Sequence, residues 1–247
     1  MDIIGIDCAT EPRNVGLAHA RLCGRGCELV AAELGKRRPS PAQTVAKWLK
    51  DSGPTLLALD APLGWPSDLG GSLFHHEAGK PLVPDPNLLF RRETDRSIKE
   101  RIGKQPLDVG ADRIARTAHS ALRLLDELRD LSKRPIPLAW SWTEISEPVA
   151  IEVYPAATLE IRGISSTGYK EPRNQEHRSR REEIADRIGK EIEINAALRE
   201  CLVSRADILD AVGCVLAGWD FLRGLAPGPE DNALARREGW IWVPSPP

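Results

Sequence analysis

Three short apolar runs in this chain each carry a single carboxylate. Asp7 and Asp60 each end one of these runs, and Glu152 lies inside the third. Short continuous apolar runs are typical of strands that are covered on both faces of a sheet. A carboxylate on such a strand is costly to bury unless it is paired or binds a cation. The pattern therefore predicts an α/β fold with buried strands, and it indicates that their carboxylates converge on metal.

The order of the predicted elements constrains the fold further. Strands are expected at residues 2–8, 14–22, 27–34 and 55–60, and a helix that begins at Ser40-Pro41 precedes the fourth of them. Short connections that contain Gly and Asn favour antiparallel hairpins, and a helix between two strands of one sheet favours a parallel crossover. We therefore predict a mixed sheet in which three antiparallel strands are followed by parallel strands, with helices on both faces.

The second half of the chain is expected to complete this fold. The remaining predicted elements are a Pro- and Gly-rich loop at 61–110, an amphipathic helix at 111–131, a strand at 149–154, a charged helical segment at about 170–200, a long helix at 204–223 with Ser204 as its N-cap, and a docked or edge-strand tail at 239–244. We expect one domain over residues 1–247, with residues of about 61–148 as an insertion near the edge of the sheet where ligands commonly bind.

Composition narrows the classes of partner and compartment. The formal net charge is -2, so no global basic field indicates nucleic-acid binding, and such a partner would need a local basic surface. The five cysteines lack paired CxxC spacing, which favours reduced thiols in a cytoplasmic protein. No apolar run approaches the ~20 residues of a membrane helix, and no signal peptide is expected. The sequence does not determine the oligomeric state.

A fourth and a fifth carboxylate lie near the start of the long predicted helix. Asp207 and Asp210 are three residues apart, so they share a helix face, and Asp210 lies in an otherwise apolar stretch. Together with Asp7, Asp60 and Glu152 they predict a site for Mg²⁺ or Mn²⁺, hard cations that prefer oxygen ligands. The five histidines show no metal-ligand spacing.

Each of these carboxylates also has a structural interpretation. Asp7 and Asp60 could initiate turns where their strands end. Glu152 could form a salt bridge with an arginine. Asp207 could cap its helix, an interpretation that suits Asp210 less well.

The chain also resembles the domain of unknown function family 429, described as predicted nucleases of the ribonuclease H-like fold. The motifs that carry the resemblance are Gly5-Ile6-Asp7-Cys8-Ala9, Leu59-Asp60-Ala61-Pro62-Leu63-Gly64, Arg92-Glu93-Thr94-Asp95, Ile151-Glu152-Val153-Tyr154-Pro155, Gly168-Tyr169-Lys170, Asp207-Ile208-Leu209-Asp210-Ala211 and Trp240-Ile241-Trp242-Val243-Pro244. The resemblance implies that Arg92 and Asp95 belong to the site, with Arg92 as a candidate phosphate binder, although helix capping explains this segment equally well. Tyr169 and Lys170 form a second candidate pair for substrate, an aromatic platform beside a cation.

These observations lead to one functional hypothesis and two rivals. The hypothesis is a metal-dependent nuclease in which Asp7, Asp60, Glu152 and Asp210 are catalytic and a pair of divalent ions promotes phosphodiester hydrolysis. The first rival is an actin-like phosphotransferase that binds ATP, a class that usually needs a duplicated fold and Gly-rich phosphate loops. The second is a non-catalytic nucleic-acid-binding module that retains the fold.

Overall fold

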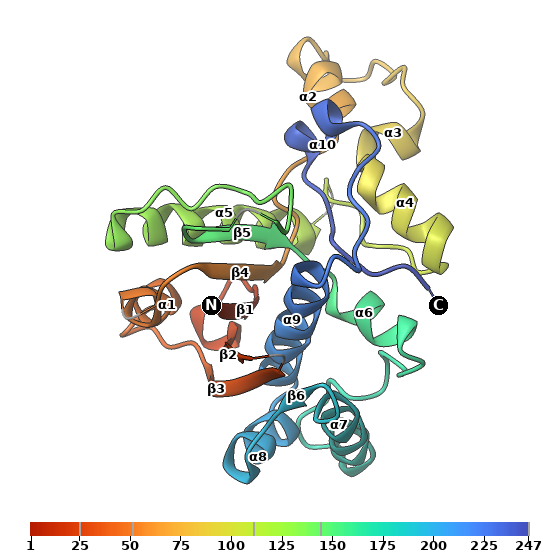
Figure 1. Ribbon diagram of the computed structural model, residues 1–247. Coiled ribbons are helices and arrows are strands. Elements are labelled where there is room, and N and C mark those ends of the chain that lie inside the picture. Colours follow the sequence, from red (N-terminus) through yellow and green to blue (C-terminus); the bar gives the residue numbers. More distant parts are fainter. Residues whose placement is uncertain (25, 51, 111, 144, 247) are drawn as a thin grey trace.

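A six-stranded mixed sheet lies at the centre of the computed structural model, which describes residues 1–24, 26–50, 52–110, 112–143 and 145–246 (Figure 1). The strands are β1 (Asp2–Asp7), β2 (Gly16–Cys23), β3 (Gly26–Leu34), β4 (Thr55–Asp60), β5 (Val149–Glu152) and β6 (Ile192–Glu193), in the order β5-β4-β1-β2-β3-β6. Strands β1, β2 and β3 are antiparallel, whereas β4 runs parallel to β1 and β5 runs parallel to β4. The predicted mixed sheet, antiparallel and then parallel, is confirmed.

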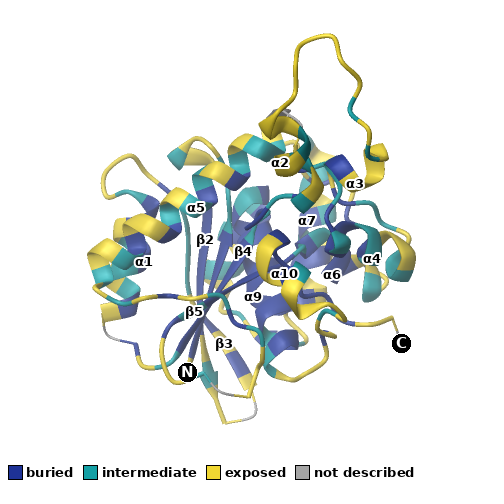
Figure 2. Cartoon of the chain, turned by 90° about the horizontal axis from the view of Figure 1, so that it is seen from above, coloured by how far each residue is buried: buried dark blue, intermediate teal, exposed yellow. Residues whose placement is uncertain are grey.

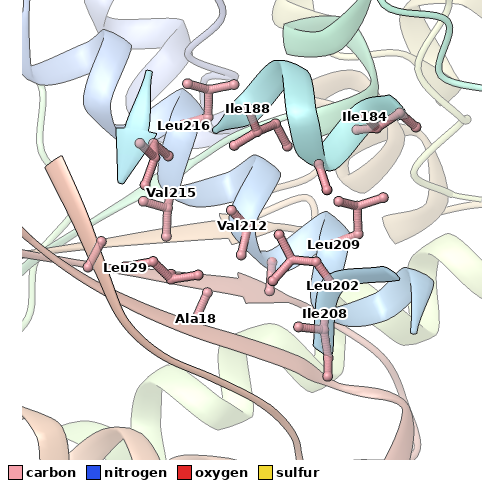
Figure 3. Close-up of a cluster of buried hydrophobic side chains, with 14 of the residues drawn as sticks. Ala18, Leu29, Ile184, Ile188, Leu202, Ile208, Leu209, Val212, Val215 and Leu216 are labelled. Carbon is pink, nitrogen blue, oxygen red and sulfur yellow. The ribbon is translucent and has the colours of Figure 1, made fainter. Parts of the chain in front are cut away.

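Helices cover both faces of the sheet. On one face, α1 (Pro41–Lys50) and α5 (Asp112–Ser132) pack on residues such as Ile4 and Leu57. On the other face, α9 (Ala206–Leu222) lies across the strands and is joined by α6 (Pro155–Ile161), α7 (Gln175–Ile188) and α8 (Ala196–Ser204). Figure 3 shows this second core, where Leu29 from the sheet meets Val212 and Ile188 from the helices. Figure 2 shows that the strands lie in the buried centre of the molecule.

Close contact between the sheet and α9 depends on two glycines. A Cβ atom on Gly5 of β1 would lie 2.0 Å from the backbone oxygen of Ala211, and one on Gly16 of β2 would lie 1.9 Å from that of Asp207. Only glycine leaves room for a helix backbone at such a distance. The first turns of α9 are therefore held directly against the carboxyl end of β1.

The region predicted as a loop at 61–110 contains three short helices. They are α2 (Ser67–Phe74), α3 (Pro86–Phe90) and α4 (Glu93–Ile102), and α10 (Asn232–Glu238) packs against two of them, away from the sheet (Figure 1). Glu238 accepts hydrogen bonds from the backbone N–H of Ser67 (2.7 Å) and of Glu93 (2.8 Å), the first residues of α2 and α4. A carboxylate there satisfies free N–H groups and complements the helix dipole. This partner of α2 and α4 comes from the far end of the sequence, so no local pattern indicates the contact, whereas α3 is capped locally by Asp85.

Two predicted boundaries in the second half of the chain were wrong. The charged segment is not one helix, since α7 ends at Ile188 and buried Ile192 then pairs with β3 as part of β6 before α8 begins. Ser204 does not cap α9, because it ends α8 and the N-cap of α9 is Arg205. The predicted helix at 111–131 is present as α5, although residue 111 lies outside the described residues.

Several smaller predictions hold. Ser40 caps α1, since its Oγ accepts a hydrogen bond from the N–H of Gln43 (3.2 Å) and its own N–H donates to Oε1 of Gln43 (2.9 Å). The second strand is also present, although it begins at Gly16 and not at residue 14, because a short 3₁₀ helix, η1 (Pro12–Asn14), forms the connection between β1 and β2. The tail docks beside β5, where the N–H of Trp242 donates to the backbone oxygen of Glu152 (2.9 Å). Within the described residues, no helix combines the length and the apolar character that a membrane crossing requires.

Candidate carboxylate site

Strand register decides which carboxylates meet. Asp7 of β1 is the direct partner of Asp60 of β4, so the two side chains lie on the same face of the sheet. Alternation from Gly5, which faces α9, places both on the α9 face. Glu152 of β5 instead pairs with Leu59, whose side chain packs in the core under α1 and α5. Glu152 therefore points to the opposite face from Asp7 and Asp60.

The third carboxylate on the α9 face is Asp210. It is 3% exposed, and both of its oxygens have partners. The hydroxyl of Tyr169 donates to Oδ1 (2.7 Å), and the ammonium of Lys170 contacts Oδ2. Consecutive residues of the connection before α7 therefore fix the orientation of this carboxylate.

Burial and mutual repulsion change the protonation of the three carboxylates. Burial raises the pKa of Asp60 to about 7, and the negative charge of Asp210 adds to this effect. Burial also raises the pKa of Asp7 well above its usual range, with Asp210 and then Asp60 as further causes. Lys170 acts in the opposite direction on all three groups. The three carboxylates therefore lack enough nearby positive charge, of which the Lys170 ammonium supplies only a part.

Asp7 and Asp60 accept no hydrogen bond from the described residues, and both are only partly buried because they line a cavity. Unpaired carboxylates in such a place favour a bound cation. Among the described residues, however, no three His, Cys, Asp or Glu side chains stand so that they could hold a metal ion. The ammonium of Lys170, which contacts Asp210, occupies one side of the group. Carboxylate oxygens are the donor type that a hard cation prefers, and the positive charge next to Asp210 in this structure is the Lys170 ammonium.

Glu152 belongs to a separate, buried ion-pair network. Its two oxygens accept hydrogen bonds from Nη2 (2.7 Å) and Nη1 (2.8 Å) of Arg92, and Oε2 also accepts one from the N–H of Leu63 (3.0 Å). Asp95 binds the same guanidinium through Nη2 (2.9 Å) and Nε (3.1 Å). The salt bridge considered for Glu152 from the sequence is thus present, and the structure does not bring Glu152 together with Asp210.

The guanidinium of Arg92 has no free donor for a phosphate. An arginine offers five N–H groups, and in Arg92 four bind the carboxylates of Asp95 and Glu152 while the fifth donates to the backbone oxygen of Glu238 (3.2 Å). Asp95 also accepts a hydrogen bond from the N–H of Arg92 (2.9 Å), the residue before α4, as the acidic residue of a capping box does. Both residues therefore have structural partners at the positions where the resemblance implied substrate contacts.

The other predicted site residues are placed as follows. Asp207 is partly exposed on the first turn of α9 and forms an ion pair with Arg205 (3.1 Å). It raises the pKa of Asp7 through its charge, so it lies near the group without joining its hydrogen bonds. The Tyr169 ring is 1% exposed, which leaves no open face for a stacked base. Lys170 was predicted to contact a substrate phosphate, and in the structure its ammonium contacts the carboxylate of Asp210.

A cavity of about 240 Å³ opens beside Asp7 and Asp60. Its lining also includes the Arg92 network, together with an apolar wall. Tyr154 and Leu107 are among the lining residues that were not predicted as site residues from the sequence. Tyr154 lies two residues after Glu152 along the chain, and this spacing from a predicted site residue could have indicated it. Leu107 lies in the connection between α4 and α5 and carries no local signal.

A comparison with known protein families gives a match over most of the chain. Residues 3–233 match the family described as "Protein of unknown function (DUF429)". The chain belongs to the DUF429 family. The match covers the sheet from Ile3 onward and includes Asp7, Asp60 and Asp210, so the carboxylate site lies within the family region of this DUF429 protein. No curated protein matches the chain.

Proposed function

We propose that this DUF429 protein is a divalent-metal-dependent nuclease of the ribonuclease H-like fold. The observation that carries the proposal is the pair Asp7 and Asp60, two partly buried carboxylates in direct register that receive no hydrogen bond from the described residues. The sheet supports the fold assignment, because three antiparallel strands followed by parallel strands form the pattern described for that fold.

In this proposal Asp7 and Asp60 would hold the cation, and Asp210 would join them only after its carboxylate turns away from Lys170, because the three do not form a metal-binding group as the described residues stand. Mg²⁺ or Mn²⁺ would supply positive charge that stabilises the attacking and leaving oxygens in phosphodiester hydrolysis. Tyr169 holds Asp210 in place through its hydroxyl. Lys170 neutralises Asp210 in the metal-free protein and is free to turn toward a substrate phosphate when Asp210 takes another partner. Glu152 supports the cavity wall through Arg92 in this scheme.

The rivals are weighed by the same residues. The described residues form one six-stranded sheet, whereas the actin-like class usually needs a duplicated fold. A non-catalytic binding module would keep the fold without turnover. Unpaired Asp7 and Asp60 favour the metal-dependent nuclease. Burying two carboxylates side by side lowers stability, and a binding module without a metal would gain nothing that offsets this cost.

Calorimetric titration of Mn²⁺ into wild type and Asp7→Asn, followed by hydrolysis assays on oligonucleotides, tests the proposal. We expect saturable Mn²⁺ binding and metal-dependent hydrolysis in wild type, and loss of both in Asp7→Asn without loss of folding. Asp186→Asn is the matched control, since it removes the same charge from an exposed ion pair with Arg199. Equal hydrolysis by Asp7→Asn would refute the assignment, and nucleic-acid binding that ignores a chelator would favour the binding module.

A further inference from the structure

We propose that the cavity beside Asp7 and Asp60 receives one unpaired base, so that the substrate is a single strand or a frayed end. This inference rests on the proposed nuclease function and specifies its substrate class. The cavity volume is about 240 Å³, which is below the roughly 300–1,000 Å³ of pockets for drug-sized ligands. It has room for one nucleotide unit and not for a stack of base pairs.

The wall of the cavity suits the flat, largely apolar face of a base. It combines an aromatic ring with aliphatic side chains: Pro62, Pro106, Leu107, Ile114, Val153, Tyr154 and Ile241. Tyr154 is partly buried there, so part of its surface is open to a ligand. Leu107 is 68% exposed in the connection between α4 and α5. Stacking on aromatic side chains tolerates every base, because each has a π-face.

The charges of the lining decide which part of a nucleotide enters. Carboxylates are contributed by Asp7, Asp60, Asp95 and Glu152, and the cation among the described lining residues, Arg92, has all five N–H groups in use. A phosphate deep in this cavity would meet negative charge without a free donor. The neutral base therefore fits the apolar wall, while the phosphodiester stays near the Asp7–Asp60 pair, where a divalent cation would attract it.

A base in an intact duplex cannot reach such a wall. It is stacked and paired, and an enzyme that takes a base into a pocket must first extrude it or act on a single strand. The acidic protein, with a net charge of -2, offers little general attraction to a duplex backbone that could offset this cost. The cavity therefore favours unpaired nucleotides.

The test compares one oligonucleotide sequence, as DNA and as RNA, in single-stranded and blunt duplex form. Mn²⁺-dependent hydrolysis and binding by fluorescence anisotropy are measured for wild type and for Leu107→Asp, which places a charge at the apolar wall. Leu131→Asp is the matched control, because Leu131 is also an exposed leucine (45%), on α5 and outside the cavity. We expect wild type to prefer the single strand by at least about tenfold, from stacking of an unpaired base on Tyr154. We expect Leu107→Asp to lose about tenfold on the single strand, because a bound base would bury the new carboxylate against the apolar wall.

The outcomes separate this inference from the proposed function. Equal use of duplex and single strand, or a Leu107→Asp variant that behaves like Leu131→Asp, would overturn the base-binding cavity while leaving the nuclease proposal intact. If neither substrate is hydrolysed, the nuclease proposal fails, and the binding measured by anisotropy still tests whether the cavity takes an unpaired base. Single-strand binding weakened by Leu107→Asp alone supports it, and equal affinities in the two variants refute it.

Discussion

Replacing Arg92 with methionine gives the sharpest test of how the cavity wall is built. Arg92 is 1% exposed, and it pairs with Glu152 and Asp95, which are 4% and 0% exposed. The substitution leaves both carboxylates buried without their cation. Removing one partner from a buried ion pair costs about 3–5 kcal/mol, so we expect the free energy of unfolding of Arg92→Met to fall by an amount in that range.

Two further variants identify the cause of that loss. Arg92→Lys keeps the charge but offers three donors in place of the five N–H groups in use, so it should recover only part of the stability. Adding Glu152→Gln to Arg92→Met removes one of the unpaired charges. The double variant should be more stable than Arg92→Met by about 1–2 kcal/mol.

Urea unfolding followed by tryptophan fluorescence measures these differences. Arg178→Met is the matched control, because Arg178 also binds two carboxylates, Glu182 and Glu200, but on the surface of α7. Surface pairs of this kind are worth about 0–1 kcal/mol. A loss below about 1 kcal/mol in Arg92→Met would refute the structural role of the network and return Arg92 to its role as a phosphate binder.

Three other predictions concern the carboxylates and their support. The pKa of Asp60 is raised to about 7 from about 3.9 in an unfolded chain, so the stability that its protonated form contributes is fully present below about pH 4 and is lost as the pH rises through 7. Unfolding of wild type and of Asp60→Asn from pH 4 to 8 without divalent cations checks this prediction. Parallel plots of unfolding free energy against pH for the two proteins would contradict it. Lys170→Met should bind Mn²⁺ about threefold more tightly by calorimetry, since the ion no longer competes with the ammonium at Asp210. The same variant should hydrolyse substrate more slowly. Unchanged or weaker Mn²⁺ binding would argue against competition between the ion and Lys170. Gly5→Ala should lose about 1–3 kcal/mol of stability and should also bind Mn²⁺ more weakly, because its Cβ would collide with α9. Gly53→Ala has open space around its Cβ and should change neither property. A stable Gly5→Ala variant that binds metal normally would refute the close contact between β1 and α9.

The sequence by itself determined the mixed sheet and most of its strands. Continuous apolar runs predicted β1 and β4, and the helix between them required a parallel crossover. Short hairpin connections predicted that β2 pairs antiparallel with β1 and β3 antiparallel with β2. These features are local, so the chain near each element carries the signal. Among the helices of the region at 61–110, α3 and α4 have local partners at their N-termini, Asp85 and Asp95, whereas α2 depends on Glu238, which no local pattern indicates.

Only the tertiary structure decided how the carboxylates divide into two groups. Asp7 and Asp60 are register partners, whereas Glu152 pairs with Leu59, one position earlier along β4. Because side chains alternate between the faces of a sheet, this offset of one residue sends Glu152 to the opposite face, where it meets Arg92. The sequence shows that three strands carry carboxylates, but register and the packing of α9 determine which of them share a site.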